Sequence, residues 1–318
     1  YLFSIIAVFL GFGSECFAEK GKNPSDIPIK AFAQLKYTSS MQISPDGSHL
    51  AYFVPYNGRQ AIIIHPVADP KNPTVIPAAN NAEIAWFRWA NENRIVVSYA
   101  CTSTRGILTT RETRLYGFDR DGQNMTNLIK ARKKQKVGTR LGKEDVSSQF
   151  QDDVIDWLPD DPENILVVVD ADVNGKAEVR QIDVGTGNFK ELTSGRLGIQ
   201  NYKTDQQHEI RLAWGFDESK FYNSYKSPMT NGWKSIEKTS WGDKGFDLMD
   251  FFEDPKIGYA RGLNEYGRKA IYKINLETNE ILEPVFSHEN VDVDGIVDHP
   301  IPRKPAGMQY TADQPEII

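Results

Sequence analysis

The stretch Ile43-Ser-Pro-Asp-Gly-Ser-His-Leu-Ala-Tyr-Phe53 carries the pattern that decides the fold. An apolar residue precedes a turn that holds an acidic side chain, and the turn leads into a strand in which apolar residues alternate with others. Variants of this pattern begin at four further positions, Trp89, Trp157, Trp214 and Phe251. Their spacings of 46, 68, 57 and 37 residues are irregular but centre on the repeat length of a four-stranded propeller blade.

A second element follows three of these units, at residues 115–122, 179–187 and 271–279. It has the form apolar, Tyr or Arg, any residue, apolar, Asp or Asn, and then a turn, and it predicts the outer hairpin of a blade. A four-stranded sheet with two apolar faces cannot bury both by itself, so such sheets must stack around an axis. We expect Trp89, Trp157, Trp214 and Phe251 to be core residues that wedge between neighbouring blades.

Composition agrees with an all-β soluble domain. The 318 residues are 40% hydrophobic and 25% charged, and the formal charge of −6 excludes a dedicated nucleic-acid binder, which needs a basic face. Helical periodicity is scarce, with one short candidate of about two turns at residues 29–35. Elsewhere short β-branched and aromatic runs, such as residues 94–99 and 165–170, are separated by turn residues. The predicted fold is an all-β propeller of four-stranded blades, incomplete at the C-terminus.

The N-terminal residues differ in kind from the rest of the chain. Residues 1–12 form an apolar run of the length of a secretory signal, and Cys16 and Ala18 occupy the −3 and −1 positions of a possible cleavage site. We interpret residues 1–18 as a signal peptide, 19–40 as an N-terminal arm and 41–318 as the propeller. A membrane anchor and a buried N-terminal strand are the alternatives. Cleavage would leave no membrane span and an exported, periplasmic protein.

Several motifs occur in an order that resembles a known family. They are residues 29–35 leading to Ile43-Ser-Pro-Asp-Gly, the turn at 119–122, Ile210-Arg-Leu-Ala-Trp-Gly-Phe-Asp217 with Trp233 downstream, and residues 291–297 followed by 307–310. Together they resemble the N-terminal β-propeller of exported bacterial prolyl oligopeptidase-family serine peptidases, in the acylaminoacyl-peptidase and dipeptidyl-aminopeptidase branch. The resemblance implies an α/β-hydrolase domain with a Ser-His-Asp triad elsewhere in the protein, and a propeller that restricts the access of peptide substrates to it.

The catalytic half of such a peptidase is not in this sequence. No serine has glycines two residues before and two residues after it, as the nucleophile elbow of that fold requires, and the alternation of strands and helices that builds a parallel sheet is missing. No catalytic residue is therefore assigned, and we expect no peptide hydrolysis from these 318 residues. The sequence predicts about five blades and a partial one at 291–318. The alternative function is a stand-alone exported propeller, similar to TolB, that binds a protein partner.

Asp170, Asp172 and Asn174, followed by Gly175, match the first half of a calcium-binding loop. The position where a bidentate Glu should close that loop holds Gln181. Asn174-Gly175 is also the preferred pair for a tight hairpin between strands, so we interpret the segment as a turn. The sequence predicts no cofactor and no metal site.

Three other groups of residues have simple structural interpretations. Asp292, Asp294, Asp298 and His299, with His288 nearby, are expected to be solvated on a strand face, with a metal site as the alternative. Cys101 is expected to be an unreactive, half-buried thiol. A basic stretch is expected to be an exposed loop between blades, with a patch for an acidic partner or a membrane surface as the alternative. Its residues are Lys130, Arg132, Lys133, Lys134, Lys136, Arg140 and Lys143.

Overall fold

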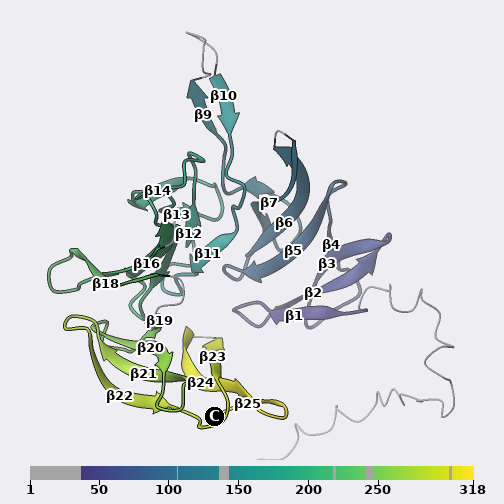
Figure 1. The fold of residues 1–318 in the computed structure, drawn as a ribbon. Helices are drawn as coiled ribbons and strands as arrows, with labels where there is room; N and C mark the ends of the chain where they lie inside the picture. The colour runs from purple at the N-terminus through teal and green to yellow at the C-terminus, as the bar shows by residue number, and fades with distance from the viewer. Residues whose placement is uncertain (1–36, 106, 136–142, 218–219, 241–245, 301–302) are drawn as a thin grey trace, which may run out of the picture.

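Six antiparallel sheets follow one another along the chain in the computed structural model, which describes residues 37–105, 107–135, 143–217, 220–240, 246–300 and 303–318. Five sheets have four strands and the sixth has three, and in each the strands are hydrogen-bonded in sequence order. We call these sheets blades 1 to 6. The first strand of each blade lies toward the middle of the molecule and the last toward the periphery (Figure 1).

The strand bounds are as follows. Blade 1 contains β1 (Ser39–Ile43), β2 (His49–Tyr56), β3 (Arg59–Pro66) and β4 (Thr74–Pro77). Blade 2 contains β5 (Ala82–Trp89), β6 (Arg94–Arg105), β7 (Leu108–Asp119) and β8 (Thr126–Asn127). Blade 3 contains β11 (Asp153–Asp156), β12 (Asn164–Val169), β13 (Glu178–Asp183) and β14 (Phe189–Thr193).

Blade 4 contains β15 (Asn201–Thr204), β16 (Ile210–Asp217), β17 (Lys220–Lys226) and β18 (Trp233–Ser240). Blade 5 contains β19 (Asp247–Phe251), β20 (Ile257–Leu263), β21 (Lys269–Asn275) and β22 (Glu280–Phe286). Blade 6 contains β23 (Val293–Pro300), β24 (Arg303–Thr311) and β25 (Pro315–Ile317). A separate two-stranded hairpin, β9 (Arg132–Gln135) and β10 (Lys143–Val146), lies between blades 2 and 3 in the sequence.

The central strand β12 shows why a continuous apolar run forms part of a blade. Ile165, Val167 and Val169 belong to the apolar cluster shared with blade 2, whereas Leu166 and Val168 belong to the cluster shared with blade 4. Successive side chains of a strand point to opposite faces of the sheet, so one run supplies two cores. All five side chains are buried, which satisfies both faces of the blade.

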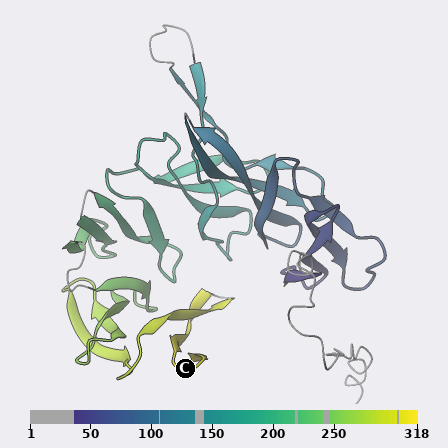
Figure 2. The same cartoon turned by 45° about the vertical axis from the view of Figure 1, so that its right-hand side comes forward.

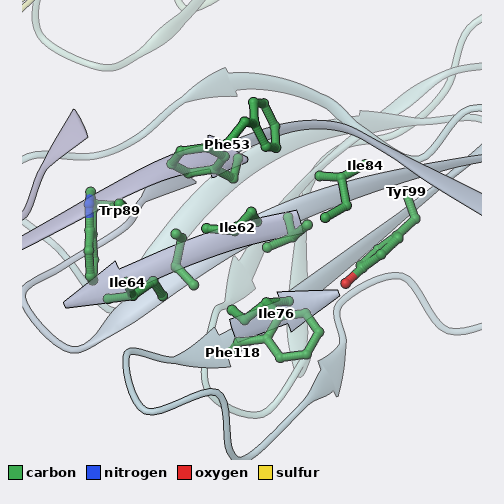
Figure 3. Packing of buried hydrophobic residues seen from close by; sticks show 12 residues of the cluster. Phe53, Ile62, Ile64, Ile76, Ile84, Trp89, Tyr99 and Phe118 are labelled. Atoms are coloured by element: carbon green, nitrogen blue, oxygen red, sulfur yellow. The ribbon is translucent and has the colours of Figure 1, made fainter. Parts of the chain in front are cut away.

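Five apolar clusters lie between consecutive blades. Figure 3 shows the cluster between blades 1 and 2, to which Phe53 and Ile62 of blade 1 and Tyr99 and Phe118 of blade 2 belong. The rings of Phe53 and Phe87 meet edge to face, with centroids 4.8 Å apart. The blades therefore stack through their faces, as in a propeller.

The blades form an open arc, with blades 1 and 6 at its two ends (Figures 1 and 2). Among the described residues, each internal blade takes part in an apolar cluster on both of its faces, whereas blades 1 and 6 each take part in one. The predicted fold class, an all-β propeller of four-stranded blades, is confirmed. Within the described residues there is no helix. The predicted signal peptide and the predicted helix at 29–35 lie outside the described residues.

The four predicted wedge residues have different outcomes. Trp89 and Phe251 end the inner strands β5 and β19 and are buried, and Trp157 directly follows β11 and is partly buried against the core between blades 2 and 3. Trp214 also packs against an interblade core, but its predicted place in the repeat is wrong. It lies in the middle of β16, and the pattern that follows it is the hairpin between β16 and β17.

The inner strand of blade 4 instead ends at Thr204 and is followed by the turn at residues 205–209. With Thr204 as the marker, the interval from Trp157 is 47 residues and the interval to Phe251 is again 47. The repeat is thus more regular than the sequence pattern suggested. The single long interval, from Trp89 to Trp157, contains the additional hairpin β9–β10.

The predicted outer hairpins are confirmed. Residues 115–122, 179–187 and 271–279 lead from the third strand to the fourth in blades 2, 3 and 5, respectively.

The basic stretch was expected to be a loop. The structure instead pairs Arg132–Gln135 with Lys143–Val146 as an antiparallel hairpin that projects away from the blades (Figure 1). Residues 136–142 of this stretch lie outside the described residues. No helix in the described part of the chain is long and apolar enough to cross a membrane.

Candidate functional site

The strand order places two sets of connections at opposite ends of the propeller. Within a blade the strands are antiparallel and sequential, so the inner strand starts at the same end where the second and third strands are joined. We call this the hairpin end. The opposite end holds the turns between first and second strands, and we call it the turn end. Loops that cluster at one end of a propeller are the usual position for a binding site.

Carboxylates lie at the start of four inner strands at the hairpin end. They are Glu83 on β5, Asp153 on β11, Asp247 on β19 and Asp294 on β23, and all are exposed. Only Asp294 was noted from the sequence. The others are unremarkable as sequence features, because their shared position becomes visible only when the inner strands have been identified.

Cations partly neutralise these carboxylates. Glu83 Oε1 lies 3.2 Å from Arg111 Nη2, and Asp247 Oδ2 lies 3.2 Å from Arg261 Nη2. Arg261 also donates from Nη1 to the carbonyl oxygen of Asp294 at 3.1 Å, which connects blades 5 and 6. At two of these four inner strands, the hairpin end therefore pairs an acidic side chain with a basic one.

The carboxylate of Asp152 joins blade 2 to blade 3. It accepts hydrogen bonds from Trp86 Nε1 at 3.2 Å, Ser98 Oγ at 2.7 Å and Thr113 Oγ1 at 2.6 Å. The next residue, Asp153, is reached by solvent but is surrounded by protein on several sides. Desolvation by the surrounding protein, together with repulsion from the Asp152 carboxylate, raises the pKa of Asp153 to about 6.

At the turn end, a histidine and an aspartate connect blades 3 and 4. His208 Nδ1 lies 2.9 Å from Asp156 Oδ1, and Thr204 donates from Oγ1 to Asp156 Oδ2 at 2.5 Å. Asp156 is buried, whereas His208 is partly exposed. An Asp–His pair can activate a nucleophile by accepting its proton. In the described residues, however, no hydrogen bond joins His208 to a serine or cysteine. This arrangement is suited to holding two blades together.

A cleft of about 540 Å³ opens at the hairpin end between blades 1 and 2. Its charged lining residues are Arg59, Glu83 and Arg111, and Cys101 also lines it. The remaining lining residues are mostly small or carry amides: Gly58, Gln60, Ala78, Asn80, Asn81, Ala82, Ala100 and Thr102. No sequence pattern indicates this cleft, because its walls come from four separate segments.

A second cleft, of about 520 Å³, lies on the outer face of blade 1, away from blade 2. Met41, Leu50, Tyr52 and Val54 line it together with His65. The side chains on β2 alternate with Ala51 and Phe53, which face blade 2, so the cleft lies on the side of blade 1 against which no other blade packs within the described residues.

The predicted turn at Asp170 is a hairpin between β12 and β13. The Asp170 carboxylate accepts the backbone N–H groups of Asn174 at 3.0 Å and Gly175 at 2.8 Å. Asp172 pairs instead with Arg132 at 3.3 Å. In the described residues no three His, Cys, Asp or Glu side chains gather in a way that could hold a metal ion.

The acidic residues near the C-terminus are separately engaged. Asp292 Oδ1 accepts the N–H of Lys269 at 3.0 Å, and Asp294 Oδ2 accepts the hydroxyl of Thr311 at 2.8 Å. His288 stacks on the ring of Tyr310. Asp298 lies farther along β23, opposite Pro305, and the side chain of His299 lies outside the described residues.

Comparison with known proteins identifies the fold. No protein-family model matches the chain, and no curated protein is significantly similar to it in sequence. Prolyl oligopeptidase B from Galerina marginata, bound to a 35-residue substrate, is similar over 86% of this chain and 40% of its own, with 10% identity and a TM-score of 0.53. Acylaminoacyl peptidase from Pyrococcus horikoshii is similar over 89% of this chain and 45% of its own, with 13% identity and a TM-score of 0.45.

TolB from Acinetobacter baumannii is similar over 78% of this chain and 54% of its own, with 13% identity and a TM-score of 0.36. Structural neighbours of the chain thus include propeller regions of prolyl oligopeptidases and acylaminoacyl peptidases. The chain spans less than half the length of these two peptidases. At 10% identity the similarity to prolyl oligopeptidase B establishes a common fold and not a common activity.

Proposed function

We propose that this chain is the non-catalytic propeller of an exported, prolyl oligopeptidase-like serine peptidase and that it restricts which peptides reach the active site. The observation that carries this proposal is the structural similarity to prolyl oligopeptidase B. The similarity covers 86% of this chain and 40% of that protein. The order of the sequence motifs supports the same assignment. In the intact protein, a Ser-His-Asp triad in a separate hydrolase domain would perform acyl transfer.

A filter for peptides must resist being opened by folded proteins, and polar contacts between inner strands supply that resistance. Gln42 Nε2 donates to the carbonyl oxygen of Phe87, which joins blades 1 and 2 at 2.8 Å. Lys203 Nζ lies 2.6 Å from Asp250 Oδ2, which joins blades 4 and 5. Together with the contact of Thr204 with Asp156, these bonds hold the inner strands at fixed distances from one another.

The gene sequence downstream of Ile318 gives a direct test. A G-x-S-x-G elbow within the next few hundred codons, followed by Asp and His in that order, is expected. The product of the complete gene should then react with a fluorophosphonate probe, and replacement of the elbow serine by alanine should abolish labelling. A stop codon soon after Ile318, with no labelling of the product, would contradict the proposal and favour a stand-alone propeller that binds a protein partner.

A further inference from the structure

The cleft between blades 1 and 2 arises from a difference in hairpin length. In blade 1, β2 has 8 residues and turns back at Asn57-Gly58, both with positive φ, as a tight hairpin requires. In blade 2, β6 and β7 have 12 residues each. Blade 2 therefore extends beyond blade 1 at the hairpin end and leaves a step, which the cleft occupies.

The inner strand of blade 2 does not cover this step. Strand β5 pairs with β6 only as far as Ala82 opposite Cys101, whereas β6 and β7 remain paired to Arg105 opposite Leu108. Cys101 and Thr102 thus form a wall of the cleft at the point where β5 no longer pairs with β6. An extended segment of another chain can lie along such a wall without displacing a strand.

The charges in the cleft favour an anion. The lining contains two guanidinium groups, Arg59 and Arg111, and one carboxylate, Glu83, so it has one excess positive charge in a chain with a net charge of −6. Arg59 donates from Nη1 to the carbonyl oxygen of Ala79 at 2.6 Å, which fixes the guanidinium at the rim. In the described residues this is the one hydrogen bond that the Arg59 side chain makes.

Arg111 can exchange its partner at low cost. Its side chain is 61% exposed and that of Glu83 is 68% exposed, and an ion pair so exposed contributes little to stability. A guanidinium can bind a carboxylate through two parallel hydrogen bonds, which is stronger and more directional than the present single contact. A ligand carboxylate can therefore replace Glu83 as the partner of Arg111.

The uncharged lining is suited to a peptide backbone. Gln60, Asn80 and Asn81 each carry a side-chain amide, which offers both a donor and an acceptor. Among the described residues, no hydrogen bond involves any of these three amides. Their polar groups are thus available to the N–H and C=O groups of a bound extended peptide.

We propose that this cleft binds a peptide through a carboxylate group held by Arg59 and Arg111. A single carboxylate matches the single excess positive charge, whereas a phosphate dianion would leave a net negative charge in the cleft. The carboxylate can come from the C-terminus of the peptide or from an acidic side chain. This inference does not depend on the proposed peptidase function, because it concerns residues of the propeller alone.

The test uses the whole chain and three acetylated alanine tetrapeptides in titration calorimetry. One has a free C-terminal carboxylate, one has an amidated C-terminus, and one has an amidated C-terminus with an internal glutamate. We expect at least one carboxylate peptide to bind about tenfold or more tightly than the neutral peptide, since hydrogen bonds to charged groups contribute that much. Comparison of the two carboxylate peptides shows which source of carboxylate the cleft accepts.

Four variants assign the binding to the cleft. Arg59→Gln and Arg111→Gln should each lower the affinity for the carboxylate peptide about fivefold or more. Glu83→Gln should raise this affinity because a competing carboxylate is removed. Arg120→Gln is the matched control, since Arg120 is a partly exposed arginine of blade 2 at the opposite, turn end. Its binding should equal that of the wild-type chain, and melting curves of all four variants should show that each is folded.

Cys101 gives a second, local readout. A bound peptide should slow alkylation of Cys101 by iodoacetamide, measured by mass spectrometry on the tryptic fragment that contains Cys101, so that Cys16 does not contribute. Equal affinity for all three peptides would overturn the proposal. So would absence of binding by any peptide, or weakening by Arg120→Gln as large as that caused by Arg111→Gln.

Discussion

Arg94 in blade 2 donates from Nε to the carbonyl oxygen of Val184 in blade 3, at a distance of 2.8 Å. The same guanidinium donates from Nη1 to Asp119 Oδ1 at 2.8 Å and from Nη2 to Thr126 Oγ1 at 2.8 Å. The side chain is 5% exposed. One buried cation thus holds three segments together at the turn end, and its charge is compensated by Asp119 and by backbone oxygens.

Replacement of Arg94 should destabilise the propeller strongly. Arg94→Leu leaves Asp119 partly buried without its cation and leaves the Val184 carbonyl without its donor, so we expect a loss of about 3 to 5 kcal/mol in the free energy of unfolding. Chemical denaturation followed by tryptophan fluorescence measures this. Arg120→Gln, at a partly exposed arginine next to Asp119, should change stability by less than about 0.5 kcal/mol. Equal stabilities of the two variants would contradict the role of Arg94.

Gly215 of β16 should not tolerate a side chain. A Cβ atom there would lie 2.0 Å from the carbonyl oxygen of Gly198, a backbone atom that cannot move away alone. We expect Gly215→Ala to lower the free energy of unfolding by about 1 to 3 kcal/mol. Gly232→Ala is the matched control, because its Cβ would meet only Thr230 Oγ1 at 3.4 Å. The melting temperatures of the two variants should therefore differ clearly.

Asp153 should make the stability of the chain depend on pH. Desolvation and repulsion from Asp152 raise its pKa from 3.8 to about 6, so the folded state binds a proton more tightly than the unfolded state does. The folded state therefore loses stability from this group as pH rises from about 4 to above 6. Asp153→Asn should match the wild-type chain near pH 4 and exceed its melting temperature near pH 8. A constant difference between the two across this range would show that Asp153 does not titrate in this way.

Adjacent residues of β2 should respond differently to the same substitution. Phe53 is buried between blades 1 and 2, so Phe53→Ala should lower the free energy of unfolding by about 3 to 5 kcal/mol. Tyr52 lies on the outer face of blade 1, beside His65, in the apolar cleft. Tyr52→Ala should cost much less stability and should reduce self-association of the chain, because exposed apolar faces promote contacts between molecules.

Equilibrium denaturation measures the stability of both variants, and sedimentation velocity at several protein concentrations measures self-association. A wild-type chain that stays monomeric at every concentration would rule out association through the outer face of blade 1. Similar losses of stability in the two variants would show that this face is covered.

The repeat could be predicted from the sequence wherever a bulky apolar residue ends an inner strand. Trp89 and Phe251 satisfy this condition and were placed correctly. Blade 4 does not satisfy it, since its inner strand ends at Thr204, a small polar residue whose hydroxyl is needed by Asp156. The repeat pattern instead matches at Trp214 in the neighbouring strand β16, where a similar turn follows.

The candidate site could be predicted far less well than the fold. The cleft between blades 1 and 2 requires Arg59, Glu83 and Arg111 to meet, and these residues lie on three different strands. Their meeting depends on the length of the hairpin between β6 and β7 relative to that between β2 and β3. Periodicity within one strand carries no information about such a difference between blades.

The amino-acid pattern is enough to predict short antiparallel strands in repeated sheets, because side-chain alternation and turn residues act over a few neighbouring residues. Two features become visible only in three dimensions: the arc is open between blades 1 and 6, and charged groups from several strands gather at the hairpin end. These features depend on how one sheet packs against the next. That packing is set by contacts between residues far apart in the chain, such as Arg94 and Val184.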